Sequence, residues 1–198
     1  MSELQTYLQK SAARRSRLCP RQVLGVRFSL AGLSALGLTP PPERDRLLVI
    51  SETDGCFVGA VEVVTGAGVD RHSLRIEDFG KTAAVYVDRQ SGVAVRVSPA
   101  PGLRARAANY APPGEKRHYF IQLHAYQVMP DSELIILQPV RLTPPLATLL
   151  GRPGVRTNCE HCGEEIINQR EVMRAGQTLC KACAGLAYYL HTTQPPEA

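Results

Sequence analysis

The chain of 198 residues is long enough for one medium-sized domain with a substantial hydrophobic core and an additional small unit. Its most apolar segment, residues 23–38, contains Arg27 and three glycines, and no secretory signal opens the sequence, so we expect neither a membrane span nor secretion. The formal charge of +5 lies entirely in residues 1–50, which carry eight Lys and Arg against three Asp and Glu.

Two helices are predicted in the N-terminal region. The first seventeen residues are polar and basic, with apolar side chains at helical spacing, which predicts a short helix. A stronger helix begins at Cys19-Pro20, because proline is favoured at the first helical position, and it ends at Gly37 before three prolines. Cys19 is therefore predicted at the N-cap, where the helix dipole and unpaired amides favour a thiolate.

A buried strand and another helix are predicted next. Residues 47–50 form a short, fully apolar run that is typical of a buried strand. Thr53-Asp54 is predicted as the N-cap of a helix over residues 55–64. Cys56 then lies in the first turn of this helix, so the thiols of Cys19 and Cys56 can face one another if the two helices lie side by side.

The middle of the chain is rich in β-prone segments. Residues 73–78, 82–88 and 93–98 are separated by glycine-containing turn signals, which predicts a meander of antiparallel strands. A helix over residues 115–128 and a strand over residues 133–140 follow. The predicted fold class is α+β: a helix-strand-helix-three-strand core with a mixed or antiparallel sheet, followed by a small C-terminal ribbon.

The composition divides the chain into four parts. Residues 1–143 form the α+β domain, and residues 144–156 are a linker punctuated by proline and glycine. Residues 157–190 form the ribbon, and residues 191–198 form a tail that we expect to be disordered.

Four cysteines in the ribbon carry the strongest chemical signal of the sequence. Cys159 and Cys162 form one C-x-x-C turn, Cys180 and Cys183 form another, and seventeen residues separate the two turns. Two facing turns of this kind place four thiolates at the corners of a tetrahedron, with Zn–S distances of about 2.3 Å. The ribbon is therefore predicted to bind one Zn²⁺, or iron in a heterologous preparation, and two disulfides in a secreted chain are the alternative.

The surroundings of these cysteines limit the function of the ribbon. His161 lies within the first turn, but four cysteines already complete the coordination, so we expect it to face solvent, with replacement of one cysteine ligand as the alternative. Residues 156–191 carry four basic and four acidic side chains, and nucleic-acid binding requires an excess of positive charge. We therefore do not expect nucleic acid as a partner, although a zinc-ribbon nucleic-acid-binding protein remains an alternative. The metal site and the missing signal favour the reducing cytoplasm.

Several short strings occur in an order that is specific in combination. They are Leu18-Cys19-Pro20, Gly25-Val26-Arg27, residues 52–56, Val64-Thr65-Gly66, residues 78–81, residues 96–99 and the start of the ribbon at residues 159–164. From about residue 11 to residue 190, the chain resembles the FmdE family, which takes its name from formylmethanofuran dehydrogenase. The resemblance implies a helix-strand-helix, three strands and a C-terminal zinc ribbon. It also implies an accessory role around molybdenum- or tungsten-dependent formylmethanofuran dehydrogenase, or in one-carbon metabolism or metal handling.

The chain departs from this family at its N-terminal motif. Members typically read His-Gly-His-x-Cys-Pro-Gly, whereas both histidines are replaced here, by Arg15 and Arg17. Ala67 stands where a further cysteine is common. The resemblance implies that these family positions form a second metal site. Because arginine does not shed its proton to ligate a metal, we interpret the motif as degenerate.

Cys19 and Cys56 are the thiols that remain at this second site, and three interpretations stay open. Both can be buried as small hydrophobic residues. They can belong to a residual metal or thiolate site completed by Asp54, Glu52, His72 or a partner chain. They can also form a redox-active pair.

The arginines near Cys19 lead to a different hypothesis. Arg15, Arg17 and Arg21 would lower the pKa of the Cys19 thiol and would hold an anion at the helix N-terminus in place of a metal. A solvated basic arm is the alternative. Lys81 is predicted as the solvated flank of a hairpin turn, whereas the resemblance implies that it can face the pocket. His118 and His124 are predicted as structural or surface residues.

No catalytic constellation emerges from these motifs. The chain has no Ser-His-Asp order, phosphate-binding loop or dinucleotide fingerprint, so we expect a zinc-binding accessory protein that is not catalytic alone. A metalloenzyme that uses Cys19 and Cys56 is the alternative. The resemblance and the exposed sheet edges predict a homodimer, with a further protein partner in a dehydrogenase complex.

Overall fold

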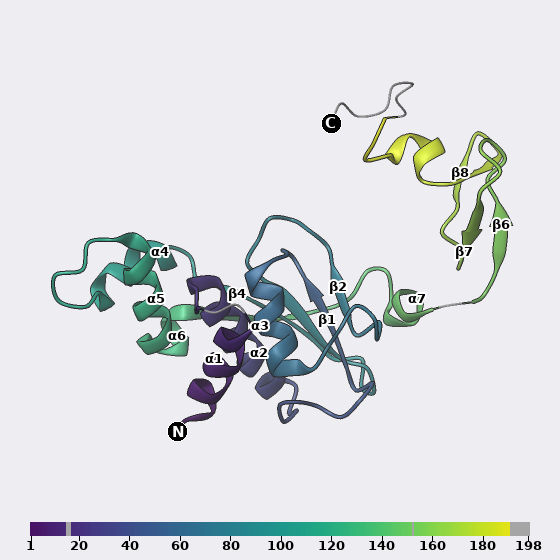
Figure 1. The fold of residues 1–198 in the computed structure, drawn as a ribbon. Coiled ribbons are helices and arrows are strands. Elements are labelled where there is room, and N and C mark those ends of the chain that lie inside the picture. The colour runs from purple at the N-terminus through teal and green to yellow at the C-terminus, as the bar shows by residue number, and fades with distance from the viewer. Residues whose placement is uncertain (15–16, 152, 191–198) are drawn as a thin grey trace. The chain divides into compact units, whose positions relative to one another are not determined.

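The computed structural model describes residues 1–14, 17–151 and 153–190. The chain divides into two compact units, Met1–Leu146 and Ala147–Ala198 (Figure 1). The first unit combines a mixed β-sheet with helices, and the second carries two small hairpins. The predicted α+β fold class is confirmed.

Three helices come from the N-terminal third of the chain. They are α1 (Glu3–Ala13), α2 (Pro20–Ala35) and α3 (Cys56–Thr65). Cys19 is the N-cap of α2, as predicted, and its backbone N–H donates to the Gln22 side chain over 2.9 Å. Helices α2 and α3 lie side by side (Figure 1). Gly25 allows their close approach, because a Cβ at this position would lie 2.6 Å from the Phe57 carbonyl oxygen.

The predicted start of α3 is wrong in one respect. The N-cap is Gly55, with φ of 71°, rather than Thr53-Asp54. The Ser51 hydroxyl donates to the Thr53 carbonyl over 2.6 Å, so Thr53 belongs to the turn that leaves the preceding strand. A positive φ at the cap position suits glycine, which explains why the helix begins at Cys56, one residue later than expected.

The sheet of the first unit has five strands in the order β2-β1-β3-β4-β5. Their bounds are β1 Leu47–Ser51, β2 Leu74–Ile76, β3 Ala84–Asp88, β4 Ala94–Pro99 and β5 Ile135–Val140. The predicted three-strand meander is wrong for β2, which pairs with β1 in parallel. Helix α3 connects these two strands, and a strand–helix–strand connection returns the chain in the parallel direction. Strands β3, β4 and β5 continue the sheet antiparallel on the other side of β1.

The segment after β2 is therefore not a hairpin turn, which corrects the interpretation of Asp78–Lys81. It carries the chain past the end of β1 to reach β3. The backbone N–H groups of Phe79 and Lys81 both donate to the Glu52 carbonyl, over 3.0 and 3.1 Å. The loop is thus attached to the residue that follows β1, and this attachment determines where Lys81 lies.

The core forms between the sheet and the helices. Tyr86 of β3 is fully buried and forms a 3.0 Å hydrogen bond with the Ser29 hydroxyl of α2. Burial raises the pKa of Tyr86 far above its ordinary value. Gly32 lets α2 approach this ring, because a Cβ there would lie 2.5 Å from a Tyr86 ring carbon.

The chain between β4 and β5 is helical. It contains α4 (Leu103–Arg106), the short 3-10 helix η1 (Ala107–Tyr110), α5 (His118–Val128) and α6 (Asp131–Leu134). Arg27 of α2 is 9% exposed and connects α2 to the end of α5. Its guanidinium donates to the carbonyls of Tyr126 and Met129, over 2.9 and 2.6 Å, and pairs with Asp131. These contacts of Arg27 hold α5 against α2.

The second unit is built from short elements. Helix α7 (Leu146–Leu150) forms within the segment that was predicted as a linker. Two antiparallel pairs follow, together with the helical turn η2 (Ala182–Leu186). The pairs are β6 (Arg156–Asn158) with β7 (Glu165–Ile167), and β8 (Val172–Arg174) with β9 (Gln177–Leu179). Within the described ranges, no helix has the length and apolar character needed to cross a membrane.

Candidate functional site

The first cysteine turn follows β6. The Cys159 N–H donates to the Glu164 carbonyl over 2.9 Å, and the Gly163 N–H donates to the Cys159 carbonyl over 2.8 Å. Gly163 has a φ of 77°, a conformation that few other residues adopt without strain. These bonds close a tight turn that brings Cys159 and Cys162 to the same side.

The second cysteine turn connects β9 to η2. The Cys183 N–H donates to the Cys180 sulfur over 3.4 Å, and the Ala184 N–H donates to the Cys180 carbonyl over 2.9 Å. The Glu160 N–H donates to the Thr178 carbonyl over 2.9 Å, which joins the first turn to strand β9. The two turns therefore face one another through backbone hydrogen bonds.

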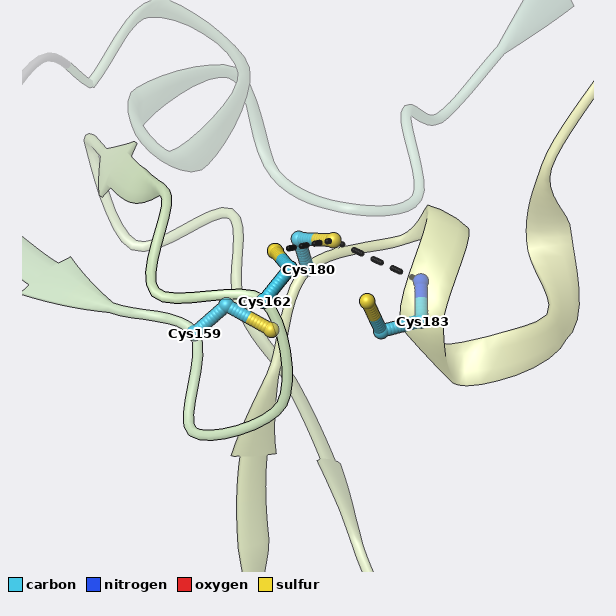
Figure 2. A group of neighbouring side chains, drawn as sticks. All are labelled: Cys159, Cys162, Cys180 and Cys183. Carbon is cyan, nitrogen blue, oxygen red and sulfur yellow. Dashed lines mark hydrogen bonds between the residues drawn. The ribbon is translucent and has the colours of Figure 1, made fainter. Parts of the chain in front are cut away.

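Together the turns form the four-cysteine cluster of Cys159, Cys162, Cys180 and Cys183. All four sulfurs lie within 4.8 Å of one another and point toward a common space (Figure 2). The sulfurs of Cys162 and Cys180 are 3.9 Å apart, close to the roughly 3.8 Å edge of a tetrahedron with 2.3 Å metal–sulfur bonds. A disulfide requires about 2.05 Å, and all four cysteines are free thiols. The residues present fit a metal ion, and His161 is exposed, as predicted.

The thiols of the cluster influence one another's ionisation. Backbone N–H groups, chiefly that of Cys162, lower the pKa of Cys159 to about 6. The pKa of Cys183 is raised to about 12, chiefly by its hydrogen bond to Cys180. Four neighbouring thiols cannot all ionise together without a cation among them. A bound divalent ion supplies this charge and favours four thiolates.

The two other cysteines, Cys19 and Cys56, lie at the first turns of α2 and α3 and are hydrogen-bonded to each other. The expected lowering of the Cys19 pKa is wrong. Burial raises this pKa, the neighbouring Cys56 adds to the rise, and the backbone N–H of Gln22 opposes it without outweighing it. The physical reason is that desolvation of the half-buried Cys19 thiol raises its pKa more than the N-terminus of the helix lowers it.

The residues named as further ligands for this thiol pair are engaged elsewhere or exposed. Glu52 is bound by Arg96, and Asp54 and His72 are exposed. In the part of the chain that the structure describes, the four-cysteine cluster is the one group of three or more His, Cys, Asp or Glu that could hold a metal ion. Cys56 lines a hollow of about 380 Å³ together with Arg14, which pairs with Glu62 over 2.9 Å.

A larger cavity of about 700 Å³ opens in the first unit and is called the basic cleft here. Segments from α2, the loop before β3, the end of β4, α4 and α5 form its walls. The lining residues that matter for its chemistry are Arg21, Lys81, Arg96, Arg104, Gln122 and Tyr126. Two of them, Arg21 and Lys81, were considered from sequence alone.

The remaining cations of the cleft were missed. Arg96 lies in one of the strings that carry the family resemblance, but a strand pattern does not reveal which side chains border a cavity. Arg104 lies on α4, which was not predicted, although residues 103–108 follow a glycine and consist largely of strong helix formers. Helix propensity in this stretch is the signal that could have found Arg104.

The predicted arginine site is only partly described by the structure. Arg15 lies outside the described residues. Arg17 is exposed and Arg21 lines the basic cleft, whereas Cys56 borders the smaller hollow with Arg14. His118 and His124 are exposed, in agreement with a surface assignment.

Fold and cluster together define a metal-binding α+β protein with an appended four-cysteine module. The family model described as "FmdE, Molybdenum formylmethanofuran dehydrogenase operon" matches residues 16–136. The chain therefore belongs to the FmdE family, as its sequence strings predicted.

Two individual proteins are similar to the chain. A "Probable S-adenosyl-L-methionine-binding protein" from Archaeoglobus fulgidus is 31% identical over 99 residues, which cover 48% of this chain and 27% of that relative. An FmdE-like protein of tungsten formylmethanofuran dehydrogenase from Syntrophus aciditrophicus has a solved structure with a TM-score of 0.55 and 22% identity, covering 94% of this chain and 95% of that one. At this identity the structural likeness establishes the fold alone.

Proposed function

We propose that this protein is a zinc-binding accessory protein of the FmdE family, acting in molybdenum- or tungsten-dependent one-carbon metabolism or in metal handling. The observation that carries the proposal is the four-cysteine cluster, with all sulfurs within 4.8 Å, in a chain of this family. Four thiolates leave no open coordination position, which is the pattern of a structural rather than a catalytic zinc site. The protein is therefore not catalytic alone at this site.

Metal analysis of the purified, untagged protein tests the zinc assignment. We expect one zinc per chain after purification without added metal, since four thiolates in tetrahedral geometry favour zinc over calcium, magnesium or manganese. Iron in place of zinc would revise the identity of the ion. Stoichiometry near zero, with the cysteines paired as disulfides, would overturn the proposal. The compartment that we propose is the reducing cytoplasm, where free thiols persist.

A homodimer and a partner in a dehydrogenase complex belong to the same proposal. Strands β2 and β5 lie at the two edges of the sheet and expose Ile76 and Leu137. Exposed apolar edges favour pairing with another chain. Light scattering at micromolar concentration checks the homodimer, and a monomer mass would contradict it. The family description, which names a molybdenum formylmethanofuran dehydrogenase operon, is the support for the complex.

The second part of the proposed function is anion binding at the N-terminal end of the first unit. Arg21 and Lys81 line the basic cleft, and the first turn of α2 borders it through Pro20. A divalent cation entering this cleft would meet like charge, so the cleft suits an anion rather than a metal ion. Binding of inorganic phosphate, measured by calorimetry, is the simplest test of this part.

The name of the Archaeoglobus relative suggests S-adenosylmethionine as another candidate ligand. This molecule carries a sulfonium and an ammonium group against a single carboxylate, so it is a net cation at neutral pH. The chain spans about a quarter of the length of that relative (27%). The charged side chains that line the basic cleft of this chain are all cations. Charge therefore favours an anion over S-adenosylmethionine in the basic cleft.

A further inference from the structure

The volume of the basic cleft exceeds what a simple ion requires. Its volume is about 700 Å³. Small-molecule sites typically span about 300–1,000 Å³, whereas one water occupies about 30 Å³. The cleft therefore has room for an organic molecule together with several waters.

The charges that line the cleft all have the same sign. Arg21, Lys81, Arg96 and Arg104 contribute cations, and no Asp or Glu side chain of the described residues lines the cavity. Arg96 is neutralised by Glu52, which binds its guanidinium with both oxygens, over 2.6 and 2.7 Å. Among residues 1–14, 17–151 and 153–190, the other three cations take part in no ion pair.

These three cations come from separate parts of the fold. Arg21 belongs to α2, Lys81 to the loop before β3, and Arg104 to α4. The Lys81 backbone is anchored to the Glu52 carbonyl, so its position in the wall is set by the fold rather than by a free loop. Cations that approach from separate elements favour a ligand with more than one negative group, because each can then meet its own counter-charge.

The rest of the lining is apolar or neutral. Leu24, Leu103 and Tyr126 contribute apolar surface, and Tyr126 is only 2% exposed. Burial raises the pKa of Tyr126, and the nearby positive charge of Arg104 opposes this rise, so the phenol stays protonated at neutral pH. Gln122 and Ser98 add groups that form neutral hydrogen bonds. Apolar walls with a few polar groups are typical of sites for organic molecules.

We propose that the basic cleft binds a small organic molecule that carries at least two carboxylate or phosphate groups. This inference rests on the proposed anion binding and adds the class of ligand. The apolar walls contact the carbon skeleton, and Arg21, Lys81 and Arg104 contact the anionic groups. Arg96, held by Glu52, positions the wall of β4 and contributes little net charge.

Isothermal titration calorimetry with four probes tests this inference on the full chain. The probes are citrate, fructose 1,6-bisphosphate, inorganic phosphate and S-adenosylmethionine. We expect citrate or fructose 1,6-bisphosphate to bind at least tenfold more tightly than inorganic phosphate, with affinity falling as salt is raised. Tighter binding of citrate identifies carboxylates as the anionic groups, and tighter binding of the bisphosphate identifies phosphates.

Variants then locate the binding. Lys81→Ala and Arg104→Ala should each weaken binding of the tighter probe at least tenfold. Arg141→Ala is the matched control, because this arginine is exposed and does not line the cleft, and it should change the affinity less than twofold. Lys81 and Arg104 are themselves exposed, so both variants should keep the thermal midpoint of the wild type.

Results that contradict the inference show whether the ligand class alone is wrong or anion binding itself is wrong. If inorganic phosphate binds as tightly as both organic probes, anion binding stands and the inferred ligand class is wrong. If no anion binds, or only S-adenosylmethionine binds, both are wrong. If the organic anions bind equally well to the Lys81→Ala and Arg104→Ala variants, their site lies elsewhere and the inference is wrong.

Discussion

The Glu52 carboxylate and the Arg96 guanidinium form a two-point ion pair, with Nε–Oε1 and Nη2–Oε2 distances of 2.6 and 2.7 Å. Glu52 is 7% exposed, and its carbonyl also accepts the N–H groups of Phe79 and Lys81. A single residue after β1 thus holds both the β4 wall of the basic cleft and the loop that carries Lys81. The hydrogen bond to Glu52 raises the pKa of Arg96 above its ordinary value.

Replacing this carboxylate should destabilise the first unit. In the Glu52→Gln variant, Arg96 keeps its charge but loses its ionic partner, so we expect the free energy of unfolding to fall by about 1.5–3 kcal/mol. Urea denaturation followed by circular dichroism measures the change. Glu77→Gln is the control, because Glu77 is exposed and its pair with Arg75 is long at 3.4 Å, so the change there should stay within about 0.5 kcal/mol. Equal effects in the two variants would refute the importance of the Glu52 pair.

Loss of one ligand from the four-cysteine cluster should unfold the second unit selectively. Cys180→Ser removes a thiolate, and small modules of this kind depend on their metal for folding. Hydrogen exchange should show loss of protection across residues 157–190 with little change in the first unit. The metal content should fall well below that of the wild type. Retention of protection in the ribbon after metal loss would contradict a folding role for the ion.

The thiol pair of α2 and α3 is expected to hold no metal. The double variant Cys19→Ala, Cys56→Ala should keep the same metal content as the wild type, at one equivalent per chain, because the described residues around this pair supply no third ligand. Elemental analysis of the two proteins side by side measures this. Loss of a second equivalent in the double variant would refute the degenerate-site hypothesis and favour the metalloenzyme alternative.

Two glycines on neighbouring helices should respond oppositely to alanine. Gly32→Ala places a methyl group 2.5 Å from a Tyr86 ring carbon, so we expect a loss of about 1–3 kcal/mol in the free energy of unfolding through overpacking. Gly59→Ala in α3 meets no atom within 4 Å and should be neutral or stabilising by up to about 1 kcal/mol. Thermal denaturation of both variants checks the contrast. A Gly32→Ala protein as stable as the Gly59→Ala protein would contradict the close packing of α2 on β3.

The ion pair of Asp88 and Arg46 should contribute a pH-dependent part of the stability. The buried Asp88 carboxylate accepts hydrogen bonds from Arg46 and from Ser91, over 2.5 and 2.6 Å, and its pKa lies well below the ordinary value, chiefly because of Arg46. A lowered folded-state pKa gives stability that is complete above the unfolded-state pKa of about 3.9 and is lost as the pH falls through the folded-state pKa.

The Asp88→Asn variant isolates this contribution. Its free energy of unfolding should lie about 1.5–3 kcal/mol below that of the wild type at pH 7, and the difference should shrink toward pH 3. Taking the difference at each pH removes the effect of acid on the metal-binding unit, which both proteins share. A difference that stays constant between pH 7 and pH 3 would show that the contribution of Asp88 is not ionic.

Short-range signals in the sequence determined much of this protein. Two C-x-x-C turns predicted the four-cysteine cluster, because each turn positions its thiols through hydrogen bonds within a few residues. Cys19-Pro20 predicted the start of α2 for the same local reason, and the order of short strings identified the family. These features depend on neighbouring residues and therefore remain readable without the fold.

The tertiary structure alone decided the features that depend on distant residues. Strand β2 joined β1 in parallel because helix α3 returns the chain to that edge, and local turn signals carry no information on pairing partners. Burial, which no motif encodes, raised the pKa of Cys19 against the expectation from its helix position. The basic cleft arose from Lys81, Arg96 and Arg104, which belong to separate segments and meet only because the sheet and helices pack in this way. Local chemistry is readable from spacing, whereas desolvation and the meeting of distant charges exist only once the chain has folded.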